Sequence, residues 1–294
     1  MVVVNRQSGH FDTAVVERIR AIDSAALLRH AATASLGAQA AREGGIDYDV
    51  CDIDDEYAAQ VGGYAFVVVA GGDGTLHSVL NRLGSHALPL LYYPCGTINE
   101  KYKTSRRRPG AVALGRIGDA VYTYVAAAGS FTPIGYVTSA LAKRKVGVLA
   151  YLAHVLREYK VHRIGAAFTI DGQSVEGQYT LVMVLKSDRC FGFRFNGLYD
   201  ESPQNGQILL IKSPKSRGFL GKIAMFFPFF RAFFVGFRRE YHSKTMLFRT
   251  FNNATMRLEE PTDFDVDGEK VLLSGTLPLS YCDYAAPFVV WQGK

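Results

Sequence analysis

The stretch Val67-Val68-Val69-Ala70-Gly71-Gly72-Asp73-Gly74-Thr75-Leu76-His77-Ser78-Val79-Leu80-Asn81 decides the fold of this chain. A fully apolar, β-branched run leads into a turn with three glycines and then into leucine and valine at helical spacing, which predicts a buried strand, a tight turn and a helix. Glycine lets the backbone approach a ligand closely, and a helix N-terminus presents free N–H groups and a partial positive charge. The stretch therefore predicts a phosphate site at the end of a buried strand.

Asp73 is the unusual member of this turn, because a carboxylate repels phosphate unless it holds a metal ion or accepts a substrate proton. A role in binding Mg²⁺ or accepting a proton is one interpretation. The other is an ordinary strand-to-helix turn in which Asp73 or Thr75 caps the helix. The chain has no GxxxxGK[ST] loop, which excludes the P-loop enzymes.

Two further polar turns that contain glycine follow predicted strands. Asn5 to Gly9 follows the apolar run at 2–4, and Pro94 to Glu100 follows the run at 88–93. Ligands of open α/β sheets bind at the carboxyl ends of the strands. We therefore expect the three turns to meet at one edge of a sheet.

Strand and helix signals alternate over the first third of the chain, which predicts an α/β domain with a doubly wound parallel sheet over residues 1–119. The strands are expected at 2–4, 47–53, 65–70 and 88–93, and the helices at 23–42 and 76–83.

After about residue 120 short strand-like runs separated by turns dominate, which predicts a mostly antiparallel β-sandwich over residues 120–294. The strands are expected at 121–127, 166–170, 178–185, 207–211, 245–250, 255–258 and 271–273, with helices near 146–159 and 219–238. The closing strand at 287–291 fits either domain.

The composition is that of an ordinary folded protein, with 48% apolar and 20% charged residues among 294. The four cysteines are scattered, so neither a disulfide framework nor a zinc site is expected, and a reducing cytoplasm is the expected location. The formal charge of +6 fits an acidic partner such as a nucleotide or an anionic lipid, or else a mildly basic surface. No recognition motif accompanies the charge, so nucleic acid is not an expected partner.

Taken in order along the chain, these turns resemble those of the diacylglycerol kinase catalytic family, which includes bacterial lipid kinases and sphingosine kinases. Gly71 to Thr75 matches its GGDGT motif, and Asn5 to Gly9 matches its NPxSG turn with Arg6 in place of proline. Pro94 to Glu100 resembles its PxGTxND turn, and Asp267-Gly268-Glu269 matches its late DGE. GGDGT is shared with NAD kinases, so the ordered set is more specific than any single motif.

The resemblance implies a kinase that uses ATP and Mg²⁺ and transfers the γ-phosphate to a hydroxyl of a lipid such as diacylglycerol. By match of position it implies Glu269 as the general base and Asp73 as the residue that places magnesium, which makes these two the catalytic candidates. Glu100, where the family usually has aspartate, is a second candidate metal ligand. The nucleotide-binding residues that it implies are Asn5, Ser8, Gly9, Gly71, Gly72, Asp73, Gly74, Thr75, Thr97 and Asn99.

Two of these matches leave other interpretations open. Asp267-Gly268 is also a favoured pair for a plain hairpin turn. Residues 203–206, Pro-Gln-Asn-Gly, stand where bacterial members have an acidic loop that holds a structural magnesium. Asn205 could offer an oxygen, and Asp200 and Glu201 nearby could substitute for the missing carboxylates, but a dication prefers carboxylates in the loop itself, so we do not expect that metal ion here.

The segment 219–238 combines a stripe of phenylalanines at helical spacing with several cations. The phenylalanines of the stripe are Phe226, Phe230, Phe233 and Phe237, and the cations are Lys222, Arg231, Arg238 and Arg239. This composition is typical of a helix that lies on an anionic membrane, and it predicts peripheral attachment at the surface that holds the lipid substrate. The alternative is a helix packed on the core of the second domain.

Two rival functions remain at this point. One is an NAD kinase-like phosphotransferase, and the other is a catalytically silent protein that binds nucleotide or lipid. The sequence identifies neither the lipid nor the oligomeric state, for which a homodimer stays open.

Overall fold

The computed structural model describes residues 1–21, 49–64, 66–84, 88–97, 99–105, 113–130, 160–190, 192–200, 204–216, 218–283 and 288–291. The helices expected at 23–42 and 146–159 lie outside these residues. The chain forms two compact units, Met1–Val112 with Asp283–Lys294, and Ala113–Cys282. The division falls earlier than the boundary expected after residue 119, because strand β5 (Ala113–Ile117) already pairs with β6 (Ala120–Tyr122) of the second unit.

The first unit is built on a parallel sheet with the strand order β2-β1-β3-β4-β19. Its strands are β1 (Val2–Val4), β2 (Val50–Asp52), β3 (Val67–Gly71), β4 (Leu90–Pro94) and β19 (Phe288–Val290). Its helices are α1 (Ala14–Arg20), the 3₁₀ turn η1 (Ala58–Gly63), α4 (Asp73–Leu83) and α5 (Glu100–Ser105).

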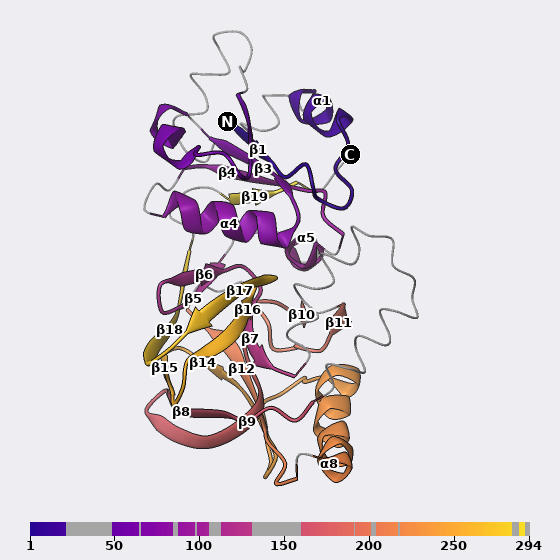
Figure 1. The fold of residues 1–294 in the computed structure, drawn as a ribbon, viewed down its shortest axis with the longest axis vertical. Coiled ribbons are helices and arrows are strands. Elements are labelled where there is room, and N and C mark those ends of the chain that lie inside the picture. Colours follow the sequence, from indigo (N-terminus) through magenta and orange to yellow (C-terminus); the bar gives the residue numbers. More distant parts are fainter. Residues whose placement is uncertain are drawn as a thin grey trace. The chain divides into compact units, whose positions relative to one another are not determined.

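The order of the strands reverses at β1, because β2 lies on one side of it and β3 on the other. With right-handed crossovers, such a reversal places the connecting helices on opposite faces of the sheet. Figure 1 shows α1 and α4 on opposite sides of the strands. The expected doubly wound α/β domain is confirmed, and the gap between β1 and β3 is its topological switch point.

Burial explains why the central strands contain only apolar residues. The side chains of β1 and those of Val67 to Ala70 in β3 are fully buried. A central strand of a parallel sheet is covered on both faces, so it shows a continuous apolar run rather than an alternating pattern.

The closing strand belongs to the first unit. β19 pairs in parallel with β4, with Phe288 opposite Leu90 and Val290 opposite Tyr92. The amide of Trp291 extends this ladder by donating to the carbonyl of Tyr92, at 2.8 Å. The first unit is therefore completed by a segment that follows the whole second unit.

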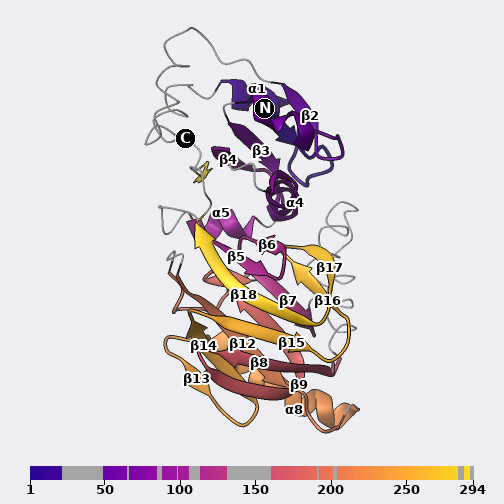
Figure 2. The ribbon, with the colours of Figure 1, turned by 90° about the vertical axis from the view of Figure 1, so that its left-hand side faces the viewer.

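The second unit is a strongly curled antiparallel sheet, which has 12 strands within the described part of the chain (Figure 2). Besides β5 and β6, its elements are β7 (Val125–Gly129), β8 (Ile164–Ile170), β9 (Gln173–Leu185), β12 (Gly206–Lys212), α8 (Phe219–Phe230), the π-helical turn η2 (Arg231–Val235), β13 (Tyr241–His242), β14 (Met246–Phe251), β15 (Ala254–Leu258), β16 (Thr262–Val266), β17 (Glu269–Leu273) and β18 (Thr276–Asp283). A separate two-stranded ribbon consists of β10 (Arg189–Cys190) and β11 (Phe193–Arg194).

The long strand β9 is the point at which the sheet folds over itself. Its first half pairs with β8, while residues 181–185 pair with β12 on one edge and with β7 on the other. One sheet thus supplies both layers of the expected antiparallel fold. The apolar interior includes Phe168, Met256 and Phe264, and a second apolar cluster lies under α8.

The structure divides one expected strand and adds others. The run at 121–127 is two strands, because Thr123 and Tyr124 leave the ladder and donate their amides to Asp267. Strands β5, β16 and β18 were not predicted. No helix in the described ranges has both the length and the apolarity needed to cross a bilayer.

Candidate functional site

The three glycine-bearing turns meet at the carboxyl edge of the first sheet, as expected. The side-chain amide of Asn5, just after β1, donates to Oγ1 of Thr75, in the turn after β3, at 3.1 Å. The hydroxyl of Ser8 donates to the carbonyl oxygen of Cys95, in the turn after β4, at 3.1 Å. The turn after β1 is therefore tied to both of the others.

Glycine is required where the turns after β3 and β4 touch. A Cβ atom added to Gly96 would lie 2.4 Å from the Cα atom of Gly72 and 2.6 Å from Oδ1 of Asn99. In the turn after β1, a Cβ atom on Gly9 would lie 2.2 Å from Oγ1 of Thr97. The backbones approach each other more closely than any larger residue allows.

The N-terminus of α4 opens into this edge. Gly72 is its N-cap residue, has an extended backbone, and provides no side chain to cap the helix. Gly74 is half-buried, and Thr75 is buried and held by Asn5. Backbone N–H groups in the first turn of such a helix, together with its dipole, favour a bound anion such as phosphate.

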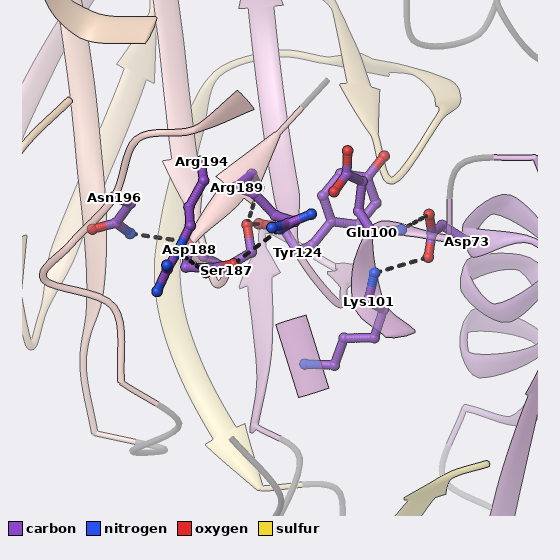
Figure 3. Close-up of polar contacts among 9 residues, drawn as sticks. All are labelled: Asp73, Glu100, Lys101, Tyr124, Ser187, Asp188, Arg189, Arg194 and Asn196. Carbon is purple, nitrogen blue, oxygen red and sulfur yellow. Dashed lines mark hydrogen bonds and ion pairs between the residues drawn. The ribbon is translucent and has the colours of Figure 1, made fainter. Parts of the chain in front are cut away.

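Asp73 caps a helix, but not the helix that the sequence suggested. Its buried carboxylate accepts the backbone N–H groups of Glu100 at 2.6 Å and Lys101 at 3.1 Å, which begin helix α5 (Figure 3). The hydroxyl of Tyr92 lies 3.5 Å from the same carboxylate. The negative charge of Asp73 is thus fixed between the turns after β3 and β4.

The donor set fits a magnesium ion that arrives with a nucleotide better than a resident metal ion. No group of three or more His, Cys, Asp or Glu side chains that could hold a metal occurs among the residues that the structure describes. Mg²⁺ bound with nucleotide usually takes only one or two carboxylates from the protein, and Asp73 provides one at this edge. Glu100, the other candidate ligand, is 1% exposed at the start of α5.

Asn99 and Thr97 lie in the turn after β4. Asn99 adopts a left-handed backbone with φ of 51°, and its amide donates to the carbonyl of Gly96 at 2.7 Å. Thr97 is exposed. The hydroxyl of Tyr92, which the sequence placed in a core strand, lies 3.4 Å from Oδ1 of Asn99.

The DGE segment lies in the second unit and forms a hairpin. Asp267 and Gly268 join β16 to β17 with positive φ angles of 53° and 96°, which is the geometry of a two-residue type I′ turn. Glu269, the expected general base, is the exposed first residue of β17. It belongs to the second unit, whereas all three turns belong to the first.

Asp267 anchors this hairpin. Its buried carboxylate accepts the backbone N–H groups of Thr123, Tyr124 and Val125 and the hydroxyl of Thr123. Burial raises the pKa of Asp267 to about 6, although these four hydrogen bonds favour the ionised form. This contact could not be predicted from the sequence, because its donors are mostly backbone groups.

Asp265, two residues earlier, is also buried. Burial raises its pKa to about 7, and the nearby charges of Asp267 and Glu269 act in the same direction. The N–H of Gly268 donates to Oδ1 of Asp265 at 2.7 Å, and this bond opposes the rise in pKa. Burial therefore favours the protonated form of Asp265 at pH values well above those at which an aspartate usually ionises.

The loop before β12 is held by a lysine. Lys186 is fully buried, and its ammonium group donates to the carbonyl oxygens of Asn205 at 2.7 Å and Asp200 at 3.4 Å. It also lies 5.2 Å from the ring centre of Tyr281. An ammonium group at these oxygens repels a dication, so the described residues of this loop, Asp200, Gln204 and Asn205, do not fit a structural magnesium ion.

A cluster of polar side chains, in which Asp188, Arg189 and Asn196 are buried and Arg194 is exposed, follows β9. Asp188 forms ion pairs with Arg189 at 3.3 Å and Arg194 at 2.8 Å (Figure 3). Asn196 donates to the carbonyl of Ser187 at 2.9 Å. This cluster could not be found from the sequence, because its residues show no motif spacing.

Comparison with known proteins gives a match over the first unit. Residues 1–114 match the family model of the diacylglycerol kinase catalytic domain. A diacylglycerol kinase from Staphylococcus carnosus (strain TM300) is 26% identical over 148 residues, which are 44% of this chain and 48% of that protein. The match thus spans about half of the length of this relative. The resemblance to the diacylglycerol kinase catalytic family is confirmed.

Solved structures show that the fold is shared over nearly the whole chain. A crystal structure of a candidate diacylglycerol kinase from Bacillus anthracis str. Sterne superposes with a TM-score of 0.65 at 16% identity, covering 98% of this chain and 95% of that one. A second structure from this organism gives 0.62 at 18% identity, with 99% and 96% covered. The two-unit architecture is therefore that of these proteins.

The contact between Gly72 and Gly96 predicts the effect of a single methyl group. Gly96→Ala should lower the free energy of unfolding by about 1–3 kcal/mol, because the added Cβ meets backbone atoms that cannot rotate away. The same change tests the expected nucleotide site, because separation of the two turns should weaken ATP binding there. Urea unfolding and titration with a fluorescent ATP analogue measure the two effects.

Gly62→Ala is the matched control for this prediction. It lies in η1 of the same unit, and a Cβ atom there meets nothing within 4 Å. It should retain both stability and binding. An unchanged Gly96→Ala variant would show that the close approach is not needed.

The buried carboxylate of Asp265 predicts a pH dependence of stability. Between about pH 4 and pH 7 the folded state keeps a proton that the unfolded chain has released, so this contribution to stability is complete below pH 4 and is lost as the pH rises to 7. Each unit of pKa difference corresponds to about 1.4 kcal/mol. Asp265→Asn should therefore show a flatter dependence than wild type in urea unfolding across this range.

Asp263→Asn, on the same strand, provides the comparison. Its exposed carboxylate pairs with Lys270 at 2.7 Å, and an exposed ion pair contributes little to stability, so this variant controls for the loss of a carboxylate from β16. Identical slopes in wild type and Asp265→Asn would contradict the assignment.

Proposed function

We propose that this chain is an ATP-dependent lipid kinase that transfers the γ-phosphate of ATP to a hydroxyl of a lipid such as diacylglycerol. The observation that carries the proposal is the meeting of three glycine-bearing turns at the N-terminus of α4, at the switch point of the first sheet. Kinase-family membership of the matching domain over residues 1–114 supports the transfer of phosphate.

The turns supply what a nucleotide phosphate needs. The backbone at Gly71 to Thr75 can approach the phosphate closely, and the α4 N-terminus provides N–H donors and a partial positive charge. Around it, the side chains of Asn5, Ser8 and Thr97 offer polar groups for the rest of the nucleotide. Hydrogen bonds between the turns hold these groups in place before ATP arrives, which lowers the entropic cost of binding.

Phosphoryl transfer depends on alignment and charge neutralisation more than on covalent chemistry. Asp73 would hold the magnesium ion, whose charge offsets that of the phosphates. The amides of Glu100 and Lys101 fix the direction of its carboxylate. Glu269, on a hairpin that Asp267 anchors, would accept the proton of the lipid hydroxyl.

A transfer assay with labelled ATP tests this proposal. The purified chain is incubated with Mg²⁺, labelled ATP and mixed micelles that contain diacylglycerol, a sphingoid base, phosphatidylglycerol or a glycolipid, with NAD in a parallel reaction. Label in a lipid product is expected. Label in NAD alone would identify an NAD kinase, and ATP binding without any product would identify a catalytically silent protein.

Removing the charge of Asp73 should abolish most of the transfer. Asp73→Asn should lower turnover by at least about 100-fold, because the amide is a poor ligand for Mg²⁺. It should also reduce the free energy of unfolding by about 1–3 kcal/mol, since one of the two amides of α5 loses its acceptor. Turnover is measured at saturating lipid, and stability by urea unfolding.

Glu269→Gln separates the catalytic effect from the structural one. Glu269 is exposed, so this variant should lose transfer while its unfolding free energy stays within about 0.5 kcal/mol of wild type. Near-wild-type turnover of the Asp73→Asn variant would refute the proposed role of the Asp73 carboxylate.

A further inference from the structure

Exposed apolar side chains are concentrated on one helix of the second unit. Ten large hydrophobic residues are exposed within the described ranges, and eight of them lie between residues 219 and 235 of α8 and η2. Phe219 is 77% exposed, Phe227 68% and Phe234 67%. We call the exposed side of 219–235 the aromatic face.

The aromatic face is not needed for the core, because the same helix covers the core with other residues. Met225, Phe229 and Ala232 are buried in the apolar cluster beneath α8. The stripe expected from the sequence is divided between the two sides, since Phe237 is buried whereas Phe226 and Phe230 are exposed. The expected packing on the core therefore holds for one side of this segment, and the other side is left exposed.

Ring contacts make the exposed residues one continuous surface. Phe230 stacks on Phe226 with ring centres 5.8 Å apart and on Phe234 at 5.3 Å. Phe193 of β11, itself 40% exposed, contacts Phe234 at 5.2 Å and extends the face beyond the helix.

The charge around the aromatic face is positive. Residues 204–239 contain seven lysines and arginines and no aspartate or glutamate. Near the start of α8, the exposed Arg163 donates to the carbonyl of the exposed Lys215. At the other end, Arg238 and Arg239 are exposed.

Arg231 does not take part in this charged border, although the sequence suggested it. Its guanidinium group donates to the carbonyl of Gly236 and lies 4.9 Å from the ring centre of Phe237 and 4.7 Å from that of Tyr241. The exposed face between the basic ends is consequently almost free of polar groups.

We propose that the aromatic face docks on the surface of an anionic lipid bilayer. Lys222 and Arg231 are the only polar side chains in 219–235, so the face offers few of the hydrogen bonds that a protein interface of ordinary kind contains. A bilayer requires none of them, and phenylalanines with basic neighbours are typical of helices at a lipid surface. The inference deepens the proposed lipid-kinase function. It rests on that function in one respect, because the membrane would be the source of the lipid that accepts the phosphate.

Vesicle co-sedimentation without ATP and without diacylglycerol tests the docking by itself. The vesicles are equimolar phosphatidylglycerol and phosphatidylcholine, with pure phosphatidylcholine as the uncharged comparison. Wild type should bind the anionic vesicles at least tenfold more tightly than the neutral ones. The double variant Phe227→Ser with Phe234→Ser should bind the anionic vesicles at least tenfold more weakly than wild type.

Leu272→Ser is the matched control, because Leu272 is 66% exposed but lies on β17. It should bind as wild type does. Wild-type binding by the double variant, or an equal loss in Leu272→Ser, would overturn the inference. Analytical ultracentrifugation compares the oligomeric states of wild type and the double variant. A dimer in wild type and a monomer in the double variant would overturn the inference as well, because a second copy of the chain would then cover the aromatic face.

Two further measurements keep this inference separate from the proposed function. Circular dichroism and urea unfolding should show the double variant folded with wild-type stability, since both side chains are about two-thirds exposed. Transfer to a short-chain diacylglycerol dissolved in water reports on the catalytic site alone. Vesicle binding without any transfer would support the docking and refute the proposed lipid kinase activity. Transfer without vesicle binding would support the lipid kinase activity and refute the docking.

Discussion

The close approach of Gly72 to Gly96 is the constraint on which the first unit depends. Parallel pairing sets β3 beside β4, and the amide of Cys95 continues the ladder by donating to the carbonyl of Gly71. Beyond that bond the two backbones stay in contact, which only glycine allows. The contact brings α5 to the carboxylate of Asp73, and it places the turn after β4 where Ser8 reaches it.

Each unit uses a buried carboxylate to join backbone segments that are distant in sequence. Asp73 accepts two amides at the start of α5, and Asp267 accepts three amides from Thr123 to Val125, where β6 leads into β7. Burying a carboxylate is costly unless such bonds compensate it. In each case a residue of a glycine-bearing motif stabilises the local backbone. We propose that the chemistry depends on this stability, through the Mg²⁺ that Asp73 would hold and through the carboxylate of Glu269.

Much of the first unit could be predicted from sequence, because its signals are local. The runs at Val2 and Val67 indicate buried strands, and the glycines after them indicate turns whose position in a parallel sheet follows from topology. The target of Asp73 could not be predicted, because the amides of α5 carry no side-chain signature. The same holds for Lys186, whose acceptors are carbonyl groups. In the second unit, β5, β16 and β18 escaped prediction, since an edge or curled strand carries a weaker apolar pattern than a central one.

The return of β19 to the first sheet has a consequence for how the chain reaches its folded state. The ribosome releases β4 long before β19, and the second unit, an uninterrupted segment, emerges between them. At about 5–20 residues per second, the edge of β4 waits on the order of 10–40 s for its partner strand. During that interval the nascent first unit has an unpaired apolar strand edge of the kind that recruits aggregation or a chaperone. The inserted unit can finish folding first, and the host sheet closes last.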